Sequence, residues 1–151
     1  MRAKLPKGPG VWPAIWMMGT NIPQVGWPLC GEIDIMEFIG RDSSHVYGTI
    51  HYPREGGDGH AQSGSKIEVK QPYNAFHVYA LEWDRTQLKI FFDKKLYHTF
   101  KIDSAAIKND NAFCKPFYIL LNLALGGEWT GAIDDKNLPQ SFLIDYVREY
   151  Q

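Results

Sequence analysis

The chain has 151 residues, of which 44% are hydrophobic, 14% aromatic and 22% charged, and its formal net charge is -1. This length suffices for a single domain over residues 1–151 with a hydrophobic core. There is no basic excess to favour nucleic acid or an anionic membrane surface, and no apolar run approaches the ~20 residues of a membrane span, so we expect neither as a partner.

The first residues, Met1 to Pro6, lack the apolar stretch of a signal peptide, so a secreted product would have its signal outside this chain. Cys30 and Cys114 either form one disulfide or stay free, and their number does not decide between the two. The sequence has no CxxC pair, no His-rich metal spacing and no phosphate-loop glycine pattern.

The first strongly apolar run is Val11–Gly19, and its short length and internal proline favour a strand. Trp12 and Trp16 are either core side chains or stacking platforms for the apolar faces of sugar rings. Trp27 lies in the Gly/Pro-rich loop that follows. A tryptophan in a loop has less need to be buried, so we predict a ligand contact for Trp27.

Residues 31–38 carry three carboxylates within six positions: Glu32, Asp34 and Glu37. On a strand Glu32 and Asp34 share a face, but strict alternation would place Glu37 with the isoleucines in the core. An unpaired buried carboxylate is costly. We therefore predict a β-bulge at Ile35-Met36, which returns Glu37 to the face of the other two acids, above a cleft.

A row of acids of this kind suits glycoside hydrolysis, in which one carboxylate attacks as nucleophile and another protonates the leaving oxygen. The central acid can orient the nucleophile and separate the two pKa values. Four strand steps separate the outer Cα atoms by roughly 13 Å, whereas a retaining enzyme needs carboxyl groups about 5–5.5 Å apart. The long Glu side chains would have to converge. The alternatives are a solvated strand face and a metal site.

Residues 46–51 are predicted as the next strand, antiparallel to the acidic one, with His51 either structural or reaching the acids across the ladder. Residues 53–65 are Gly-rich and poor in apolar residues, which predicts a mobile loop with Asp58 and His60 in solvent.

Residues 117–125 predict a strand buried on both sides, except at Asn122, which is either a satisfied core amide or a cleft-facing donor. Many short strands with Gly/Pro turns indicate an all-β sandwich. Further strands are predicted at 76–83, 88–92, 96–100 and 142–150, with a hairpin turn at 93–95 and a short helical turn at 104–109.

Several of these segments together resemble a known family of enzymes. The segment Glu32–Glu37 resembles the catalytic signature of glycoside hydrolase family sixteen in its bulged form. Other segments resemble the laminarinase-like (endo-1,3-β-glucanase) members, in the family's order and over nearly the whole chain. They are residues 12–17, 27–28, 48–51, 76–83, 121–127 and 144–148.

The resemblance implies a concanavalin-like β-jelly-roll of two curved antiparallel sheets, with substrate across the concave one. It implies a secreted, retaining endo-hydrolase of β-1,3-glucan that requires no cofactor. By motif position Glu32 resembles the nucleophile, Asp34 its assisting acid and Glu37 the general acid/base. The positions that resemble substrate-binding ones are Trp12, Trp16, Trp27, His51, Asn122 and Trp129.

Two further expectations follow from the resemblance. Asp145 resembles an acid that helps to hold a structural calcium in some members, whose other contacts come from strands that precede Arg2. We expect the domain to be N-terminally truncated relative to the family, which puts calcium binding in doubt. Truncation would expose sheet edges and favour self-association.

Alternatives to β-1,3-glucan hydrolysis remain at this stage. One is a non-catalytic β-glucan-binding protein on the same fold, although both glutamates are present. The others are hydrolysis of mixed-linkage 1,3-1,4-β-glucan or of a galactan. A sulfated galactan would call for basic residues near the cleft, and the segments around the acids offer only Arg41 and Arg54, which favours a neutral glucan.

Overall fold

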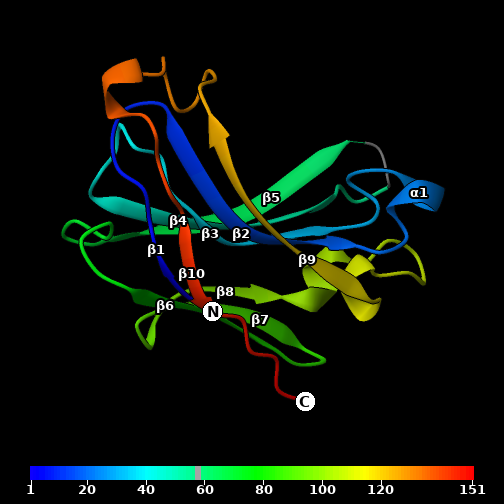
Figure 1. Cartoon of the computed structure of the whole chain (residues 1–151). Helices are drawn as coiled ribbons and strands as arrows, with labels where there is room; N and C mark the ends of the chain where they lie inside the picture. The colour runs from blue at the N-terminus through cyan, green and yellow to red at the C-terminus, as the bar shows by residue number, and fades with distance from the viewer. Residues whose placement is uncertain (57–58) are drawn as a thin grey trace.

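The fold is a β-sandwich of two antiparallel five-stranded sheets, seen in a computed structural model that describes residues 1–56 and 59–151 (Figure 1). The upper sheet in Figure 1 has the order β5-β4-β3-β2-β9 and is called the cleft sheet here. The lower sheet has the order β10-β1-β6-β7-β8 and is called the outer sheet. The prediction of an all-β jelly-roll sandwich is confirmed.

Most of the elements are strands, and the helical pieces are single turns. No helix in the described part of the chain is long and apolar enough to cross a membrane. The strands are β1 (Arg2–Lys4), β2 (Val11–Gly19), β3 (Glu32–Glu37), β4 (His45–Pro53), β5 (His60–Glu68), β6 (His77–Trp83), β7 (Gln87–Phe92), β8 (Lys95–Lys101), β9 (Phe117–Leu125) and β10 (Leu143–Tyr146). The helical turns are α1 (Ile22–Val25) and the 3-10 turns Ile102–Ala105, Ala112–Cys114 and Asp135–Asn137.

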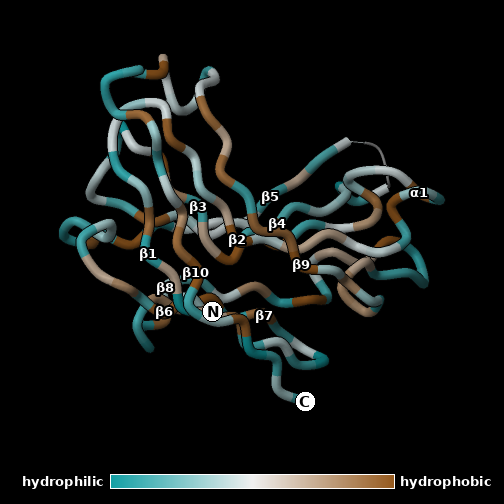
Figure 2. Tube along the Cα trace, in the orientation of Figure 1, coloured by the Kyte–Doolittle hydropathy of each residue, from teal (hydrophilic) through white to brown (hydrophobic). Residues whose placement is uncertain are grey.

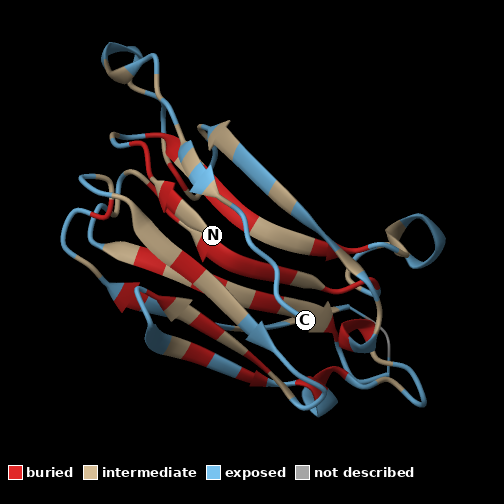
Figure 3. Cartoon of the chain, turned by 60° about the horizontal axis from the view of Figure 1, so that its bottom comes forward, coloured by how far each residue is buried: buried red, intermediate tan, exposed pale blue. Residues whose placement is uncertain are grey.

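The core lies between the sheets and is built from alternate residues of the strands. Ile33 of β3 pairs with Ile50 of β4, and both side chains are 0% exposed. Leu88 and Ile90 of β7 meet them from the outer sheet, also at 0% exposure. Figure 3 shows this alternation as red bands across the inner strands. Because side chains alternate, the other half of each cleft-sheet strand faces outward.

Several predicted elements are confirmed, β2 and β9 with the predicted bounds. The hairpin of β7 and β8 also forms, although its turn has no glycine: Asp93 and Lys94 adopt φ values of 44° and 70°. The helical turn predicted at 104–109 begins earlier, at Ile102, and the last strand is shorter than predicted, ending at Tyr146.

The prediction of a loop over residues 53–65 is wrong at both ends, since Pro53 is the last residue of β4 and His60 the first of β5. From His60 onward these residues form β5, which pairs with β4 along its whole length from Pro53↔His60. The expectation that His60 sits in solvent is also wrong, because its ring contacts His51 and Trp27. Asp58 lies outside the described residues. β5 forms because it pairs with β4. Composition alone could not predict this strand, since β5 has few apolar residues.

The prediction that β9 is buried on both sides is wrong as well. β9 is the last strand of the cleft sheet and pairs only with β2 among the described strands. Leu121 and Leu125 are 39% and 43% exposed. Figure 2 shows the apolar character of β9, and Figure 3 shows that it stays tan and pale blue. The two cysteines are free, Cys30 buried and Cys114 exposed.

Candidate active site

The predicted bulge in β3 is confirmed by the register of both neighbouring strands. Along β2, Ile15 pairs with Met36 and the next residue, Trp16, pairs with Asp34, so Ile35 is the extra residue. The β3–β4 ladder shifts over the same interval, between Asp34 and Glu37. An extra residue in one strand restores the face of the residues that follow it.

The bulge brings the three acids onto one face. Glu32, Asp34 and Glu37 lie opposite Met18, Trp16 and Ala14 of β2, which are two residues apart and share a face. On the other side the same acids lie opposite His51, Thr49 and Tyr47 of β4. The residues of β9 and β5 that pair with these positions of β2 and β4 extend the same face on both sides. The acids therefore stand in the middle of one side of the cleft sheet.

The bulge has its own support from the outer sheet. A bulge leaves a backbone group without its ladder partner, and the Tyr97 hydroxyl of β8 donates to the Ile35 carbonyl at 3.1 Å. Gly48 of β4 makes room for this side chain, because a Cβ there would lie 2.7 Å from the Tyr97 hydroxyl. The position of Glu37 thus depends on a contact across the core.

A cavity of about 820 Å³ lies above the acids, and a second of about 210 Å³ adjoins it. Glu32, Asp34, Glu37 and Trp12 line both cavities. The larger one is also lined by Tyr47, Thr49, His51, Gln62, Lys66 and Trp129, and the smaller one by Trp16 and Asn122.

The two outer glutamates differ in their electrostatics. Burial, and secondly the charge of Asp34, raises the pKa of Glu37 to about 8. The same two causes raise the pKa of Glu32 above its usual value. Each carboxylate accepts an indole N–H, from Trp27 to Glu32 at 2.7 Å and from Trp12 to Glu37 at 3.0 Å. With a pKa near 8, Glu37 is largely protonated at neutral pH and can act as an acid.

Asp34 is held mainly by charge. The residue is buried, at 3% exposure, and its Oδ2 lies 3.0 Å from Nε2 of His51. This oxygen accepts no in-line hydrogen bond from the described residues, so the ion-pair contact compensates its burial. Burial alone would lower the pKa of His51, but contact with Asp34 and its negative charge raise it.

Aromatic side chains form the walls of the cleft. The Trp12 and Trp129 rings meet edge to face at 5.3 Å between centroids, and Tyr47 meets Trp129 at 5.2 Å. Nε1 of Trp16 donates to Oδ1 of Asn122 at 2.8 Å. This contact favours the cleft-facing interpretation of Asn122 over a satisfied core amide. Trp27 is 47% exposed beside Glu32, and its contact with a ligand stays a prediction.

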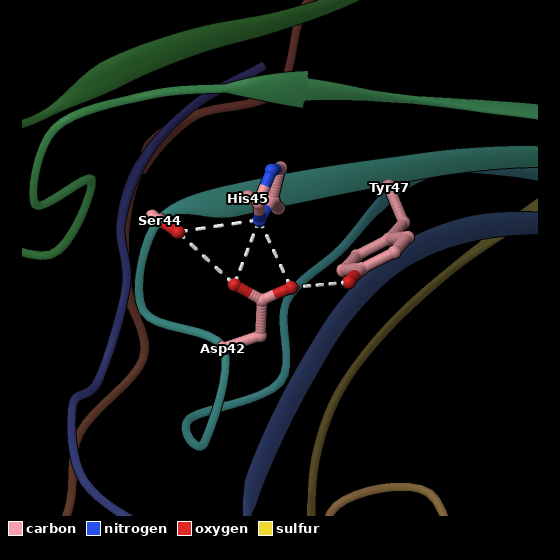
Figure 4. A network of polar contacts seen from close by, with 4 residues as sticks. All are labelled: Asp42, Ser44, His45 and Tyr47. Carbon is pink, nitrogen blue, oxygen red and sulfur yellow. Dashed lines mark hydrogen bonds and ion pairs between the residues drawn. The ribbon is translucent and has the colours of Figure 1, made fainter.

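Tyr47 is fixed in place by a polar network at the start of β4 (Figure 4). Its hydroxyl donates to Oδ2 of Asp42 at 2.5 Å. The same carboxylate lies 2.8 Å from Nδ1 of His45 and accepts from the Ser44 hydroxyl at 3.1 Å. Although burial opposes it, these partners lower the pKa of Asp42 to about 2. Burial, and secondly the hydrogen bond to Asp42, raises the pKa of Tyr47 to about 12.

The structure therefore gathers all of the sequence-predicted substrate residues around the acids, and it adds others. Tyr47 could have been found from the sequence, because it lies two and four residues before Thr49 and His51 on the same predicted strand. Lys66 and Gln62 had no such signal, because β5 was not predicted over this stretch. His60 was placed in a solvated loop for the same reason.

The calcium contact expected of Asp145 stays a prediction. Asp145 lies on β10 of the outer sheet, and its Oδ2 is 2.5 Å from Nη1 of Arg2. Calcium takes six to eight oxygen ligands, and among the described residues no group of three or more acid, histidine or cysteine ligands includes Asp145. The described residues contain one acid and histidine cluster with ligand-like spacing, Glu32, Asp34 and His51. Because Trp27 and the His51–Asp34 contact engage this cluster, we interpret it as acid/base machinery.

Comparisons with known proteins agree with the geometry. The sequence model of the family described as "Glycosyl hydrolases family 16" matches residues 1–148. The chain is 38% identical over 159 residues to the "Beta-glucanase" of Rhodothermus marinus, covering 100% of this chain and 56% of that protein. It is also 38% identical over 154 residues to the "Keratan-sulfate endo-1,4-beta-galactosidase" of Sphingobacterium multivorum, covering 100% of this chain and 36% of that protein.

A solved structure shows the same fold. The crystal structure of the laminarinase catalytic domain from Thermotoga maritima MSB8 matches with a TM-score of 0.78 at 40% identity, over 93% of this chain and 57% of that chain. The chain thus spans little more than half the length of these relatives, or less.

Proposed function

The chain belongs to glycosyl hydrolases family 16, and on that basis we propose that it is the catalytic part of a retaining endo-hydrolase that cleaves β-1,3-glucan of the laminarin type. The observation that carries this proposal is the pair Glu32 and Glu37 on one aromatic-walled cleft, with the pKa of Glu37 raised to about 8. A neutral acid beside an ionisable nucleophile is what double displacement requires.

In this mechanism Glu32 attacks the anomeric carbon while Glu37 protonates the leaving oxygen. The bond to the aglycone breaks, and Glu32 becomes esterified to the sugar. Glu37, now a carboxylate, takes a proton from water, and the resulting hydroxide equivalent attacks the anomeric carbon and releases Glu32. Asp34 lies between the two glutamates, and its negative charge favours a proton on Glu37. This charge is the second cause of the raised pKa of Glu37, and burial is the larger one.

Trp12, Trp27 and Trp129 would bind the polymer by stacking on the apolar faces of its sugar rings. Trp16 and Asn122 are joined by a hydrogen bond and would line the same path through the smaller cavity. Because Trp12 and Trp27 also donate to the two glutamates, binding and chemistry share side chains. Loss of either indole should therefore affect kcat as well as KM.

The experiment that tests the proposal is reducing-end release from laminarin by the wild type and by Glu32→Gln. We expect rapid release by the wild type and a loss of at least about 10³-fold in Glu32→Gln, because the nucleophile cannot form the ester intermediate. Glu32→Gln should still bind laminarin, since the stacking aromatics are untouched. Turnover by Glu32→Gln near the wild-type rate would contradict the assignment.

Lichenan, agarose and keratan sulfate serve as parallel substrates. Release from lichenan as well would extend the substrate to mixed-linkage 1,3-1,4-β-glucan. Lys66 favours an anionic galactan as a second candidate substrate, because it places a cation in the cleft. The segments around the acids did not reveal this cation. Release from keratan sulfate and not from laminarin would replace the substrate and keep the mechanism. Binding to laminarin without release from any polymer would favour a glucan-binding protein.

We also propose that two copies of this chain associate through the side of the sandwich that carries β9 and β10. These strands end the two sheets on the same side, while β5 and β8 pack together at the other. Among the described strands β9 pairs on one edge only, with β2, and it carries exposed apolar residues, a combination that favours further strand pairing. A polymeric substrate does not cross membranes, which supports a site of action outside the cell.

A further inference from the structure

We propose that His60 is a positioning residue of this active site: it holds His51 in the tautomer that faces Asp34, and it holds Trp27 against Glu32. His60 itself touches neither glutamate in the described contacts. It acts through two side chains that do touch the acids. The kinetic part of this inference rests on the proposed function, whereas its structural part does not.

His60 reaches the cleft from the first residue of β5. Its backbone pairs with Pro53 of β4. Its carbonyl accepts from Nε of Arg54 at 3.0 Å, which anchors the strand at this point. The side chain has the same parity on β5 as Gln62 and Lys66, which line the larger cavity. His60 therefore points to the face that carries the acids.

The first contact is with His51. Nε2 of His60 lies 2.7 Å from Nδ1 of His51, while Nε2 of His51 lies 3.0 Å from Oδ2 of Asp34. Two nitrogens at 2.7 Å share one hydrogen. When His51 is neutral, His60 donates this hydrogen to Nδ1; when His51 is cationic, His60 accepts it. In both states Nε2 of His51 keeps its hydrogen, and this nitrogen lies beside Oδ2 of Asp34 in a close contact that is not an in-line hydrogen bond.

The second contact is with Trp27. The His60 and Trp27 rings lie 4.7 Å apart between centroids, and the His51 and His60 rings lie 4.9 Å apart. Trp27 is 47% exposed in a loop and would otherwise have few constraints. Packed against His60, it directs its indole N–H to Oε2 of Glu32 at 2.7 Å. A continuous chain of contacts thus runs from Glu32 through Trp27, His60 and His51 to Asp34.

Electrostatics agree with this division of roles. Burial, and secondly the charge of His51, lowers the pKa of His60. His60 is therefore the partner that stays neutral when the pair takes up a proton, and its Nε2 lone pair remains ready to accept. Residues that orient a catalytic group through one hydrogen bond typically matter by 10- to 100-fold, as in metal sites.

Two substitutions separate the two contacts. His60→Phe keeps a ring against Trp27 and removes the nitrogen, while His60→Gln keeps a nitrogen donor and removes the ring. We expect His60→Phe to lower kcat on laminarin about tenfold with little change in KM. We expect His60→Gln to lower kcat less than His60→Phe does and to raise KM, because it frees Trp27 but keeps a donor to His51. Glu68→Gln, at the exposed far end of β5, is the matched control and should behave as wild type.

The decisive readout is nitrogen-15 NMR of the His51 ring, which does not need turnover. In the wild type and in His60→Gln we expect the signature of a hydrogen on Nε2. In His60→Phe we expect the neutral ring to populate both tautomers. A His51 spectrum and a kcat that are both unchanged in His60→Phe would overturn the inference. If the wild type released no sugar from any polymer, the proposed function would fail, and the NMR result would still decide the role of His60.

Discussion

At the scale of single residues, burial of acids organises the proposed active site. Glu37 is the clearest case, since burial and Asp34 raise its pKa to about 8 although Trp12 donates a hydrogen bond that opposes the shift. Ionising such a carboxyl in the folded protein costs free energy, because burial disfavours its charged form. That cost is also the property that makes it an acid at neutral pH.

The raised pKa of Glu37 predicts the pH profile. We expect kcat/KM to fall on the alkaline side with a midpoint near pH 8, as Glu37 loses its proton. On the acid side it should fall where Glu32 is protonated, above the usual value of 4.5 because the pKa of Glu32 is raised. A profile of kcat/KM from pH 4 to about 10 measures both limbs. Full activity well above pH 9 would contradict the acid role of Glu37.

The same shift makes a prediction about stability. The folded pKa of Glu37, about 8, exceeds the ordinary value of 4.5, so its contribution to stability is present below pH 4.5 and lost as pH rises to 8. Glu37→Gln removes this loss. Its melting temperature should match wild type near pH 4 and exceed it by several degrees near pH 8, at about 2–4 °C per kcal/mol.

The control for this measurement is Glu82→Gln, at an exposed position of β6 in the outer sheet. We expect its melting temperature to follow wild type at every pH. A Glu37→Gln protein that melts with wild type at both pH values would show that burial does not perturb Glu37.

At the scale of elements, the bulge in β3 is the feature on which the site depends. It shifts Glu37 onto the face of Glu32 and Asp34, and the carbonyl of Ile35 that it displaces is satisfied from the outer sheet by Tyr97. The two sheets are therefore coupled at the bulge that positions Glu37. The space for this contact comes from the missing side chain of Gly48.

Tyr97→Phe tests this support. Removing the hydroxyl leaves the Ile35 carbonyl unsatisfied, so the free energy of unfolding should fall by about 1–3 kcal/mol. Because the bulge positions Glu37, kcat should fall as well. The matched control is Tyr79→Phe, a buried outer-sheet tyrosine whose hydroxyl has no partner among the described residues and whose loss should be neutral or stabilising. Urea denaturation and laminarin kinetics measure the two effects, and equal stabilities for both variants would contradict the role of Tyr97.

At the scale of the whole molecule, the sandwich is closed on one side and open on the other. β5 packs against β8 on the closed side. On the open side, β9 and β10 expose apolar side chains that include Ile119, Leu121 and Leu143, each 38–48% exposed. Exposed apolar residues beside an unpaired strand edge mark an interaction surface.

The proposed self-association is tested on β9. Leu121 pairs with the core residue Ile15 and therefore points to the inner face, whereas Tyr118 pairs with Met18 and points to the outer face. We expect Leu121→Lys to weaken association at least about tenfold, which corresponds to about 1.4 kcal/mol. Tyr118→Lys, the control on the same strand, should weaken it less. Sedimentation velocity over a range of concentrations measures this, and a wild-type chain that stays monomeric throughout would contradict the proposal.

The sequence alone determined the acidic strand, its bulge and the all-β class, because these follow from local patterns. Alternation places Glu32 and Asp34 together, and the cost of a buried charge requires the bulge before Glu37. The ordered motifs further identified the family. The tertiary structure decided what depends on partners distant in the chain. It placed His60 and Lys66 on the cleft through β5, whose few apolar residues give no strand signal until β4 pairs with it. It also set the pKa of Glu37, which depends on burial by the surrounding elements. It placed β9 at the end of the cleft sheet, although the apolar sequence of β9 is typical of a buried strand.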